Sequence, residues 1–484
     1  MCGIFGIIGS EKANREIFLG LLQLQHRGQD ATGILMYDFE HPPEKSGIVL
    51  RKGFGLVNNV FNELTIASMR GSMGIGHTRY PTAGTGDESE IQPFFLQYPE
   101  GIGLALNGNI VNFPQLKKEL SEKNRRHLAS NCDAEVLLHI FAEEYSKNGG
   151  IEGIFRAVKT IYDKVIGGYS VVMLIAGKGL LAFRDPSGIR PMLIGKRGSD
   201  SSYAIASEDK ALDLLEYKDI RNVLPGEAIF IDEKLNLTSR ILAEGKRAAC
   251  SFEWIYFANV ESSLEGKSVY EVRSKLGIKL AEKIKTQFPD LKADVVIPVP
   301  DTSRTAANSL ARALGIPYEE GLIKNRYIYR TFIMATQKKR EDAIKLKLKP
   351  IEYVLKGKNV IIVDDSIVRG TTSKCIIKLV RDAGANKVYY VSTFPPIRYP
   401  CFYGIDFQSS EELMAHGKTV DEVEKAIGVD KLIYSEPKFL EEAIGVPICY
   451  ACVSGKYPTK IDDAEELARL RKEHIKITEA NHSG

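Results

Sequence analysis

Long apolar runs are absent from this 484-residue sequence. The most apolar segment, residues 165–183, is interrupted by Gly167-Gly168 and by Gly177-Lys178-Gly179. A membrane-spanning helix needs about 20 consecutive apolar residues, so this segment instead predicts two strands joined by a turn. Lys12 and Arg15 follow the first apolar run without a long apolar core after them, which argues against a secretory signal peptide. We therefore expect no membrane partner.

A large excess of charge of either sign is also absent. The 65 Lys and Arg residues nearly balance the 62 Asp and Glu residues, which leaves a net charge of +3. This balance favours no nucleic-acid partner, so local basic residues must attract any phosphate. The sequence contains 44% hydrophobic and 26% charged residues, as ordinary globular proteins do, and it has no internal repeat. A chain of this length is long enough for two domains, each with its own core.

The most informative segment is residues 359–373, in which an apolar run leads into two acids and then a Gly-Thr-Thr-Ser cluster. The run Val360–Val363 has the β-branched character of a strand buried on both faces, and helical spacing follows from Thr372 to Asp382. Hydroxyls and N–H groups at a helix N-terminus suit an anion. The alternative is an acidic turn capped by Ser366. We favour a substrate site, since capping alone needs fewer polar residues.

These residues resemble the 5-phosphoribosyl-1-diphosphate (PRPP) loop of type I phosphoribosyltransferases. The resemblance implies that the two acids contact the ribose hydroxyls, directly or through Mg²⁺, and that the loop after them cradles the 5-phosphate. A second apolar strand begins at Asp294 and ends before Thr302, which matches a metal-holding position of that family. The implied Mg²⁺ ligands are Thr302, Asp364 and Asp365, and the implied PRPP-binding residues are Asp364, Asp365, Ser366, Arg369, Gly370, Thr371, Thr372, Ser373, Lys324 and Arg330.

A basic segment, residues 324–340, resembles the lid of the same family, whose cations cover the diphosphate. A charge run is usually a solvated face, but this one lies between two predicted substrate strands. It departs from the family pattern at Tyr329, where glycine is common, and at Ala335, where proline is common. Lys345 and Lys347 stand where arginines often occur, and lysine lacks the forked geometry of arginine.

At the other end of the chain stands Cys2. Its side chain is small, so removal of Met1 is plausible and would leave Cys2 at the amino terminus. One residue would then carry both a nucleophilic thiol and a proton acceptor, because a free α-amine has a pKa of about 7.7 to 8.0. For an isolated cysteine the alternative, a buried apolar residue at the start of a strand, would be preferred.

Cys2 is accompanied by several motifs that together resemble the class II glutamine amidotransferase domain, an N-terminal-nucleophile hydrolase. The resemblance covers roughly residues 2–232. It rests on Gln25-His26-Arg27-Gly28-Gln29-Asp30, Gly76-His77-Thr78-Arg79-Tyr80-Pro81, Asn107-Gly108-Asn109, Asp133-Ala134-Glu135 and Arg184-Asp185-Pro186-Ser187-Gly188-Ile189-Arg190-Pro191.

The resemblance implies that Cys2 is the nucleophile and that Asn107 and the Gly108 N–H stabilise the oxyanion. Arg79 would hold the α-carboxylate of glutamine and Asp133 its α-ammonium, with His77 also in the glutamine site. Taken singly, each residue has a structural alternative: an ordinary ion pair for Arg79, a hairpin turn for Asn107-Gly108 and a core histidine for His77. Their joint occurrence behind Cys2 favours the functional interpretation.

The whole chain resembles the amidophosphoribosyltransferase family, in its iron–sulfur-cluster branch. This implies that glutamine is hydrolysed through a thioester and that the released ammonia attacks C1 of PRPP, which gives phosphoribosylamine and diphosphate in purine biosynthesis. Two alternatives are a non-catalytic PRPP-sensing regulator and another class II amidotransferase, for example one that aminates a sugar phosphate. Family members are typically homotetramers, so we expect a homotetramer here.

Four of the seven cysteines, Cys250, Cys401, Cys449 and Cys452, match the positions that ligate a [4Fe–4S] cluster in that branch. Four thiolates is the correct number of ligands for such a cluster. A four-thiolate zinc site and a redox pair at Cys449 and Cys452 are the alternatives. Cysteines with metal-like spacing also suggest a reducing, cytoplasmic environment.

The resemblance implies a fold of mixed class, α+β followed by α/β. Residues 2–240 would form the αββα sandwich of an N-terminal-nucleophile hydrolase. Residues 241–484 would form a type I phosphoribosyltransferase domain with a parallel sheet and a closing helix at 462–477.

Overall fold

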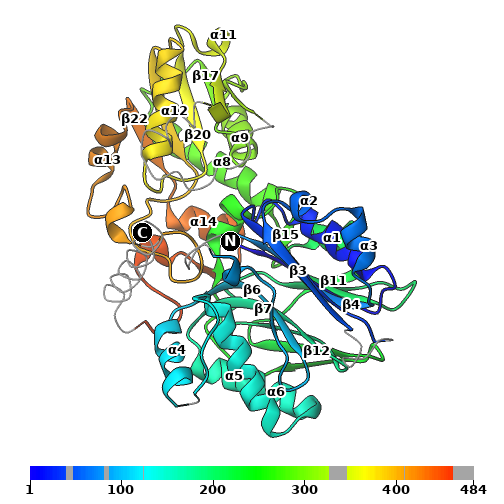
Figure 1. The fold of residues 1–484 in the computed structure, drawn as a ribbon. Coiled ribbons are helices and arrows are strands. Elements are labelled where there is room, and N and C mark those ends of the chain that lie inside the picture. Colours follow the sequence, from blue (N-terminus) through cyan, green and yellow to red (C-terminus); the bar gives the residue numbers. More distant parts are fainter. Residues whose placement is uncertain (40–46, 81–86, 124, 326–345, 408, 462–484) are drawn as a thin grey trace, which may run out of the picture.

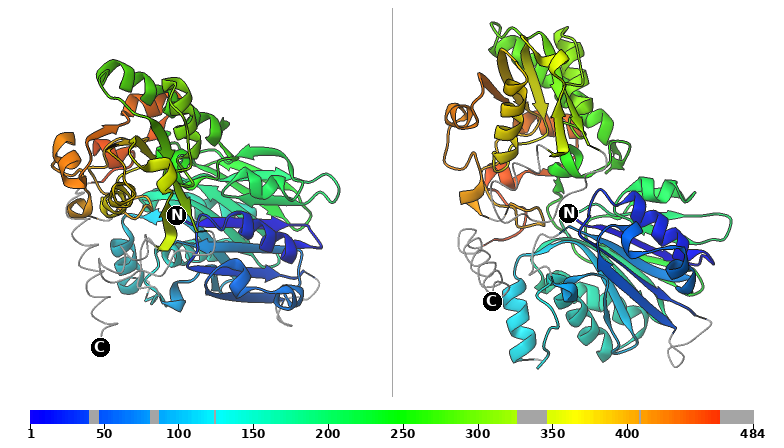
Figure 2. Two further views of the ribbon diagram at one scale, coloured as in Figure 1. Left: turned by 90° about the horizontal axis from the view of Figure 1, so that it is seen from above. Right: turned by 45° about the horizontal axis from the view of Figure 1, so that its top comes forward.

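The computed structural model describes the whole chain except residues 40–46, 81–86, 124, 326–345, 408 and 462–484. The described residues form two lobes, and the amino terminus lies between them (Figure 1). Figure 2 shows the same arrangement from two further directions. Within these residues no helix is both long enough and apolar enough to cross a bilayer. Residues 326–340 of the predicted lid, which include Tyr329, Arg330 and Ala335, lie outside the described residues, as do Lys345 and the predicted closing helix.

The first lobe contains two antiparallel sheets packed face to face. One sheet has the strand order β11 (Lys218–Asn222), β9 (Leu193–Lys196), β10 (Tyr203–Ala206), β1 (Gly3–Ile8), β4 (Met73–Arg79), β2 (Ala31–Tyr37) and β3 (Ile48–Phe54). The other has the order β13 (Leu237–Ile241), β12 (Glu227–Asp232), β8 (Gly179–Arg184), β7 (Gly167–Ile175), β6 (Ile102–Ile110) and β5 (Phe94–Leu96).

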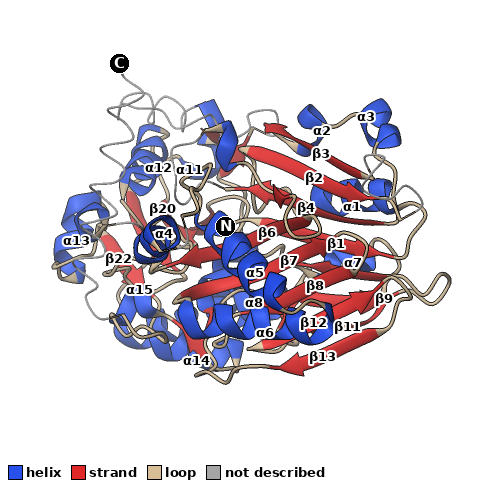
Figure 3. Ribbon diagram, turned by 60° about the horizontal axis from the view of Figure 1, so that its bottom comes forward, coloured by secondary structure: helices blue, strands red, loops and turns tan. Residues whose placement is uncertain are grey.

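Apolar side chains from both sheets, among them Ile4, Ile75 and Val172, are buried between them. Helices cover the two outer faces (Figure 3). The first face carries α1 (Ala13–Gln23), with α2 (Val57–Val60), α3 (Glu63–Ser68) and α7 (Asp209–Asp213) nearby, and the second carries α4 (Phe113–Glu122), α5 (Asp133–Lys147) and α6 (Gly150–Lys164). These four layers confirm the predicted αββα sandwich.

The second lobe is built on a parallel sheet with the strand order β17 (Val295–Pro298), β20 (Asn359–Asp364), β21 (Lys387–Ser392) and β22 (Lys431–Tyr434). Helices α8 (Val269–Gln287) and α9 (Arg304–Leu314) pack on one face, and α12 (Thr371–Asp382) and α13 (Val420–Ile427) pack on the other. Because both faces are covered, the central residues of the strands are continuously apolar rather than alternating, as their sequences predict.

Short elements connect the lobes and complete the second one. They are β14 (Ala249–Cys250), the π-helical turn η3 (Glu253–Phe257), β15 (Ser263–Leu264), β16 (Lys267–Ser268), β18 (Leu322–Lys324), β19 (Leu348–Pro350), α11 (Glu352–Leu355), η4 (Ser410–Glu412), α14 (Pro437–Ile444), β23 (Ile448–Cys449) and α15 (Ala451–Ser454). The short helix η2 (Glu88–Glu90) belongs to the first lobe, between β4 and β5. Strand β14 pairs in parallel with β23, which brings Cys250 opposite Cys449. The predicted division at residue 240 falls within the last residues of β13.

Local predictions agree closely with these elements. The apolar run at 360–363 lies in β20, and the helix expected from Thr372 to Asp382 is α12, which starts one residue earlier. The segment 165–183 forms β7 and β8 with a turn at Gly177, so it is two strands of one sheet. Asn107-Gly108 lies inside β6 and pairs with β7, so the hairpin-turn alternative for this pair is wrong.

Candidate active sites

The predicted nucleophile, Cys2, lies directly before β1 and is buried. Its thiol donates to the carbonyl oxygen of Tyr80 at 3.7 Å, and its backbone N–H donates to Oδ1 of Asn107 at 3.3 Å. Its own carbonyl oxygen accepts a hydrogen bond from Nε of Arg27 at 3.0 Å. Three segments far apart in the sequence therefore converge on Cys2. With Met1 in place the terminal amine is buried, which lowers its pKa to about 5.

Asn107 and Gly108 stand beside this thiol on β6. The side chain of Asn107 is fully buried, and its Nδ2 donor has no hydrogen-bond partner among the described residues. A buried donor without a partner costs free energy, so a group that accepts from it is expected at this position. Gly108 has φ = +151°, and a Cβ there would stand 2.1 Å from the carbonyl oxygen of Gly168. Only glycine fits, and both features suit an oxyanion site.

The two residues predicted to hold glutamine lie at the edges of the same region. Arg79 ends β4, and its Nη2 forms an ion pair with Oε2 of Glu90 at 2.7 Å. Asp133 begins α5, and its Oδ2 accepts from the N–H of Ile110, at the end of β6, at 2.8 Å. Sequence reasoning did not identify Glu90, for which no motif gave a signal. The glutamine-binding roles of Arg79 and Asp133 stay predictions.

His77 lies deeper, in the middle of β4, and is completely buried. Its Nε2–H donates to the carbonyl oxygen of Leu106 at 3.2 Å, which ties one sheet of the sandwich to the other. Burial, assisted by the positive charge of Arg79, lowers the pKa of His77 to about 3, so the ring is neutral at pH 7. These contacts are those of a core histidine, and its predicted place in the glutamine site stays a prediction.

The predicted PRPP site lies at the carboxyl ends of β17 and β20. Thr302 Oγ1 donates to Oδ2 of Asp365 at 2.5 Å, so the two strand ends meet. Asp364 accepts hydrogen bonds from the hydroxyl of Tyr390 and from the N–H of Asp365. Burial, with the negative charge of Asp365 beside it, raises the pKa of Asp364 to about 8. Two buried carboxyl groups side by side are an arrangement that a divalent cation would stabilise.

The loop after these acids leads into α12 as the sequence predicts. Gly370 has φ = +74° and caps the helix, so that Thr371, Thr372 and Ser373 form its first turn. A Cβ at Gly370 would stand 2.2 Å from Cε of Met414, so that a larger residue would displace the loop or Met414. The N–H groups of this turn and the hydroxyls of Thr371 and Thr372 suit a phosphate, whereas Ser373 is buried and its Oγ accepts from the hydroxyl of Tyr390 at 3.2 Å.

Ser366 is tied to the acids, because its Oγ donates to Oδ1 of Asp365 at 2.7 Å. The two described cations of the predicted site are held by acidic side chains. Arg369 forms ion pairs with Glu412 at 2.8 Å and with Asp406 at 3.4 Å, and Lys324 pairs with Asp301 at 2.7 Å. A phosphate would have to compete with these acids. Tyr390, which sequence reasoning missed, is recognisable only from its buried contact with Asp364.

The four predicted cluster ligands line one cavity between the lobes. Cys250, Cys401, Cys449 and Cys452 all contribute to its wall, together with Arg190. Burial raises the pKa of Cys250 to about 11 and also raises the pKa values of Cys449 and Cys452. Thiols that are costly to ionise in a protein interior become thiolates readily when they bind a metal.

Within the described residues, no three His, Cys, Asp or Glu side chains converge on a point as ligands of a single ion would. In a four-iron cluster each thiolate binds a different iron, so that its ligands stand farther apart than those of one zinc ion. The four thiols share one cavity, and the [4Fe–4S] cluster and the zinc site both stay predictions for it.

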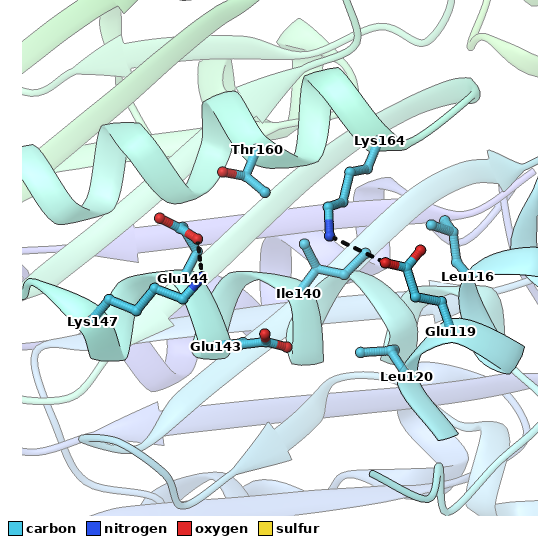
Figure 4. Close-up of a pocket in the computed structure, with 9 residues that line it drawn as sticks. All are labelled: Leu116, Glu119, Leu120, Ile140, Glu143, Glu144, Lys147, Thr160 and Lys164. Atoms are coloured by element: carbon cyan, nitrogen blue, oxygen red, sulfur yellow. Dashed lines mark hydrogen bonds and ion pairs between the residues drawn. The ribbon is translucent and has the colours of Figure 1, made fainter. Parts of the chain in front are cut away.

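A further depression lies on the outer side of the sandwich, between α4, α5 and α6 (Figure 4). Charged side chains dominate its wall, with ion pairs between Lys147 and Glu144 at 2.7 Å and between Lys164 and Glu119 at 3.7 Å. None of the predicted site residues lines it. It is a solvated surface groove apart from the chemistry described above.

Comparison with known proteins agrees with this geometry. A family model described as "Glutamine amidotransferase domain" matches residues 77–214, and one described as "Phosphoribosyl transferase domain" matches residues 269–397. The chain is 47% identical over 452 residues to the amidophosphoribosyltransferase of Pseudomonas aeruginosa, with 92% of this chain and 89% of that protein covered. It is 46% identical over 452 residues to that of Escherichia coli, covering 92% and 88%.

Two solved structures resemble the whole chain. One is described as the allosteric regulatory enzyme of purine biosynthesis, with 38% identity, a TM-score of 0.85 and coverage of 97% of this chain and 99% of that chain. The other is the glutamine PRPP amidotransferase of B. subtilis in complex with ADP and GMP, with 38% identity, a TM-score of 0.83 and coverage of 96% and 99%.

Fold and sites thus define a glutamine amidotransferase of the N-terminal-nucleophile type joined to a phosphoribosyltransferase. The chain belongs to the amidophosphoribosyltransferase family.

Proposed function

We infer that the chain is a glutamine-dependent amidotransferase that converts PRPP, glutamine and water into 5-phosphoribosylamine, glutamate and diphosphate. This is the first committed step of purine biosynthesis. The single observation that supports this function is that one chain brings together two separate groups of predicted site residues. The first places Cys2 against Asn107, and the second places Asp364 and Asp365 at the ends of parallel strands.

In the first site, removal of Met1 would transfer the terminal amine to the N atom of Cys2, 3.3 Å from Oδ1 of Asn107. Burial favours a neutral amine, as the lowered pKa of the Met1 amine illustrates, and a neutral amine can accept the thiol proton. The thiolate attacks the side-chain amide of glutamine, and the free Nδ2 of Asn107 donates to the resulting oxyanion. The protonated amine of Cys2 then returns its proton to the amide nitrogen, the C–N bond breaks, and ammonia leaves behind a thioester. Water then hydrolyses the thioester to glutamate.

In the second site, the released ammonia attacks C1 of the ribose while diphosphate leaves. Ammonium has no lone pair for this attack, so the ammonia must travel between the sites without equilibrating with water. The loop at Gly370 and the first turn of α12 would hold the 5-phosphate through backbone N–H groups and hydroxyls. The two carboxyl groups at the end of β20 would position the ribose hydroxyls.

Two bound groups belong to this proposal. Thr302, Asp364 and Asp365 would hold Mg²⁺, which when bound would neutralise part of the diphosphate charge. The four cysteines of the cavity would hold a [4Fe–4S] cluster, with zinc as the alternative group. Iron–thiolate bonds would tie β14 and the segment around Cys401 to β23 and α15.

We also propose that the enzyme acts as a homotetramer in the cytoplasm, on small-molecule substrates and without a nucleic-acid partner. The homotetramer is typical of the family, and buried free thiols are those of a protein kept reduced. The alternative of a non-catalytic PRPP sensor is not favoured, because the sandwich keeps Cys2, Asn107 and Gly108 together.

The deciding experiment measures diphosphate release from PRPP with Mg²⁺, comparing glutamine with ammonia. The protein would be purified anaerobically, and mass spectrometry would show whether Met1 has been removed. Release with both donors establishes the amidotransferase. Release with ammonia alone indicates an inactive glutaminase, and release with neither donor would contradict the proposed function.

A further inference from the structure

A chain of buried hydrogen bonds joins Cys2 to the second lobe. The carbonyl oxygen of Cys2 accepts from Nε of Arg27 at 3.0 Å, and Nη2 of Arg27 contacts both carboxylate oxygens of Glu253 at 2.9 and 3.0 Å. Oε1 of Glu253 also accepts from Nη1 of Arg190 at 3.2 Å. Nε of Arg190 donates in turn to the carbonyl oxygen of Tyr403 at 2.7 Å.

The members of this chain are removed from water. Arg27 and Arg190 are 0% exposed and Glu253 is 1% exposed. Burial alone would lower the pKa of Arg27, but the attraction of Glu253 and Glu208 outweighs it and raises that pKa. Both guanidinium groups are therefore charged and share one carboxylate. Removing one partner of a buried ion pair leaves the other charge uncompensated, so the arrangement resists displacement.

A second contact joins the second lobe to β6, the strand that carries Asn107 and Gly108. Nδ2 of Asn109 donates to the carbonyl oxygen of Phe402 at 2.9 Å. Gly404 has φ = +98°, and a Cβ placed on it would stand 2.9 Å from the oxygen and 3.0 Å from the carbonyl carbon of Gly108. Backbone therefore packs directly on backbone, with no room for a side chain. The segment Phe402–Gly404 therefore packs against Gly108, whose N–H is expected to face the oxyanion.

We propose that Glu253 and the segment Phe402–Gly404 form a brace that positions Cys2 and Gly108 for glutamine hydrolysis. Glu253 lies in η3, and the brace lies outside both segments that match the family models, 77–214 and 269–397. The proposal rests on the proposed function, because it assigns positioning residues to the glutaminase half of that reaction.

The physical reason is that a nucleophile reacts fast only when its position and direction relative to the substrate are fixed. The amine, thiol and carbonyl of Cys2 share one Cα, so holding the carbonyl through Arg27 restricts where the thiol and amine can lie. Packing of Gly404 against Gly108 likewise restricts the direction of the Gly108 N–H. Neither Glu253 nor Gly404 touches glutamine in this scheme, so both act only through the residues they hold. Misplacement of reacting groups by about 1 Å can cost roughly 10²-fold in rate.

The first test replaces the carboxylate while preserving its shape, with Glu253→Gln in the full-length enzyme. We expect glutamine-dependent kcat to fall roughly 10²-fold, with the KM for glutamine changed less than about threefold, because Arg79 and Asp133 are untouched. Ammonia-dependent diphosphate release should stay near the wild-type rate, which also shows that the variant folds.

The matched control is Glu265→Gln. Like Glu253, Glu265 lies in the region that connects the lobes and pairs with a buried arginine. Glu265 pairs with Arg184 at 2.8 Å, is similarly buried and contacts neither Cys2 nor Gly108. Its glutamine-dependent turnover should remain close to wild type. Equal losses of glutamine-dependent turnover in the two variants would mean that Glu253 only stabilises the fold and does not position Cys2.

A second variant decides the matter if Glu253→Gln does not fold. Gly404→Ala forces a Cβ against Gly108, whereas Gly417→Ala places a Cβ at another left-handed position, φ = +65°, with no heavy atom within 4 Å. Selective loss of glutamine-dependent turnover in Gly404→Ala, absent from Gly417→Ala, supports the brace. Unchanged turnover, or equal loss with both nitrogen donors, overturns it. Failure of wild-type enzyme with both donors would instead refute the proposed function.

Discussion

Thr302 and Asp365 are 63 residues apart in the sequence, yet Oγ1 of Thr302 donates to Oδ2 of Asp365 at 2.5 Å. Their strands, β17 and β20, are parallel neighbours, so both carboxyl ends reach the same edge of the sheet. Ligands of open parallel sheets bind at this edge. The contact defines where the ribose and its metal are expected, and the first prediction follows from it.

Replacing Asp364 and Asp365 by Asn should lower PRPP turnover by roughly 10²-fold or more with either nitrogen donor, because the electrostatic partners of the metal and ribose are lost. Steady-state diphosphate release with glutamine and with ammonia measures this. Asp382→Asn, an exposed residue at the end of α12, is the control. Normal kinetics in the double variant would remove both acids from the site.

Cys2→Ala should reduce glutamine-dependent turnover by at least roughly 10³-fold, because the nucleophile is lost, and should leave ammonia-dependent turnover intact. Both activities can be followed in one diphosphate assay, and glutamate formation reports the glutaminase alone. Cys375→Ala, which alters a thiol in α12, should retain both activities. Loss of both activities in Cys2→Ala would contradict the division of labour between the lobes.

Removing a cavity thiol should remove the bound group. We expect anaerobically purified protein to contain about four iron and four sulfide per chain, and Cys449→Ser or Cys452→Ser to lose them together with thermal stability. Metal analysis, sulfide analysis and the visible spectrum measure this, with Cys375→Ser as the control. Stoichiometric zinc with no iron in the wild type would favour the zinc alternative.

Acid should destabilise the protein through His77. Its pKa is about 3 in the folded chain and 6.5 as a reference, so the unfolded chain binds a proton that the folded chain excludes. Stability from this neutral ring is present above pH 6.5 and falls by about 1.4 kcal/mol for each pH unit below it, down to about pH 3.

His77→Gln can still donate to Leu106 but does not titrate. Chemical denaturation between pH 4 and 7 should therefore show a smaller loss of unfolding free energy on acidification in the variant than in the wild type. Identical pH dependence in the two proteins would mean that His77 is protonated in the folded chain.

Several helices and strands could be predicted from short sequence segments, because the residues that favour each of them are close neighbours in the sequence. The short β-branched run at 360–363 favours a buried strand, and the glycine and hydroxyls after it suit a helix start. The order of these elements, with their acids between them, already indicated a phosphate-binding loop. The motifs around Cys2, Asn107 and Arg79 likewise indicated a glutaminase before any geometry was known.

Other features depended on which segments the fold brings together. Asn107-Gly108 has the sequence of a turn but lies within β6, because pairing with β7 decides its conformation. Arg369 was predicted to face phosphate, and its pairing with Glu412 depends on a contact across 43 residues.

Sequence alone therefore determined the types of chemistry, through residues that are near neighbours along the chain. Only the tertiary structure decided that Glu253 lies between Arg27 and Arg190, because buried charges select their partners by position in space and not by distance in sequence.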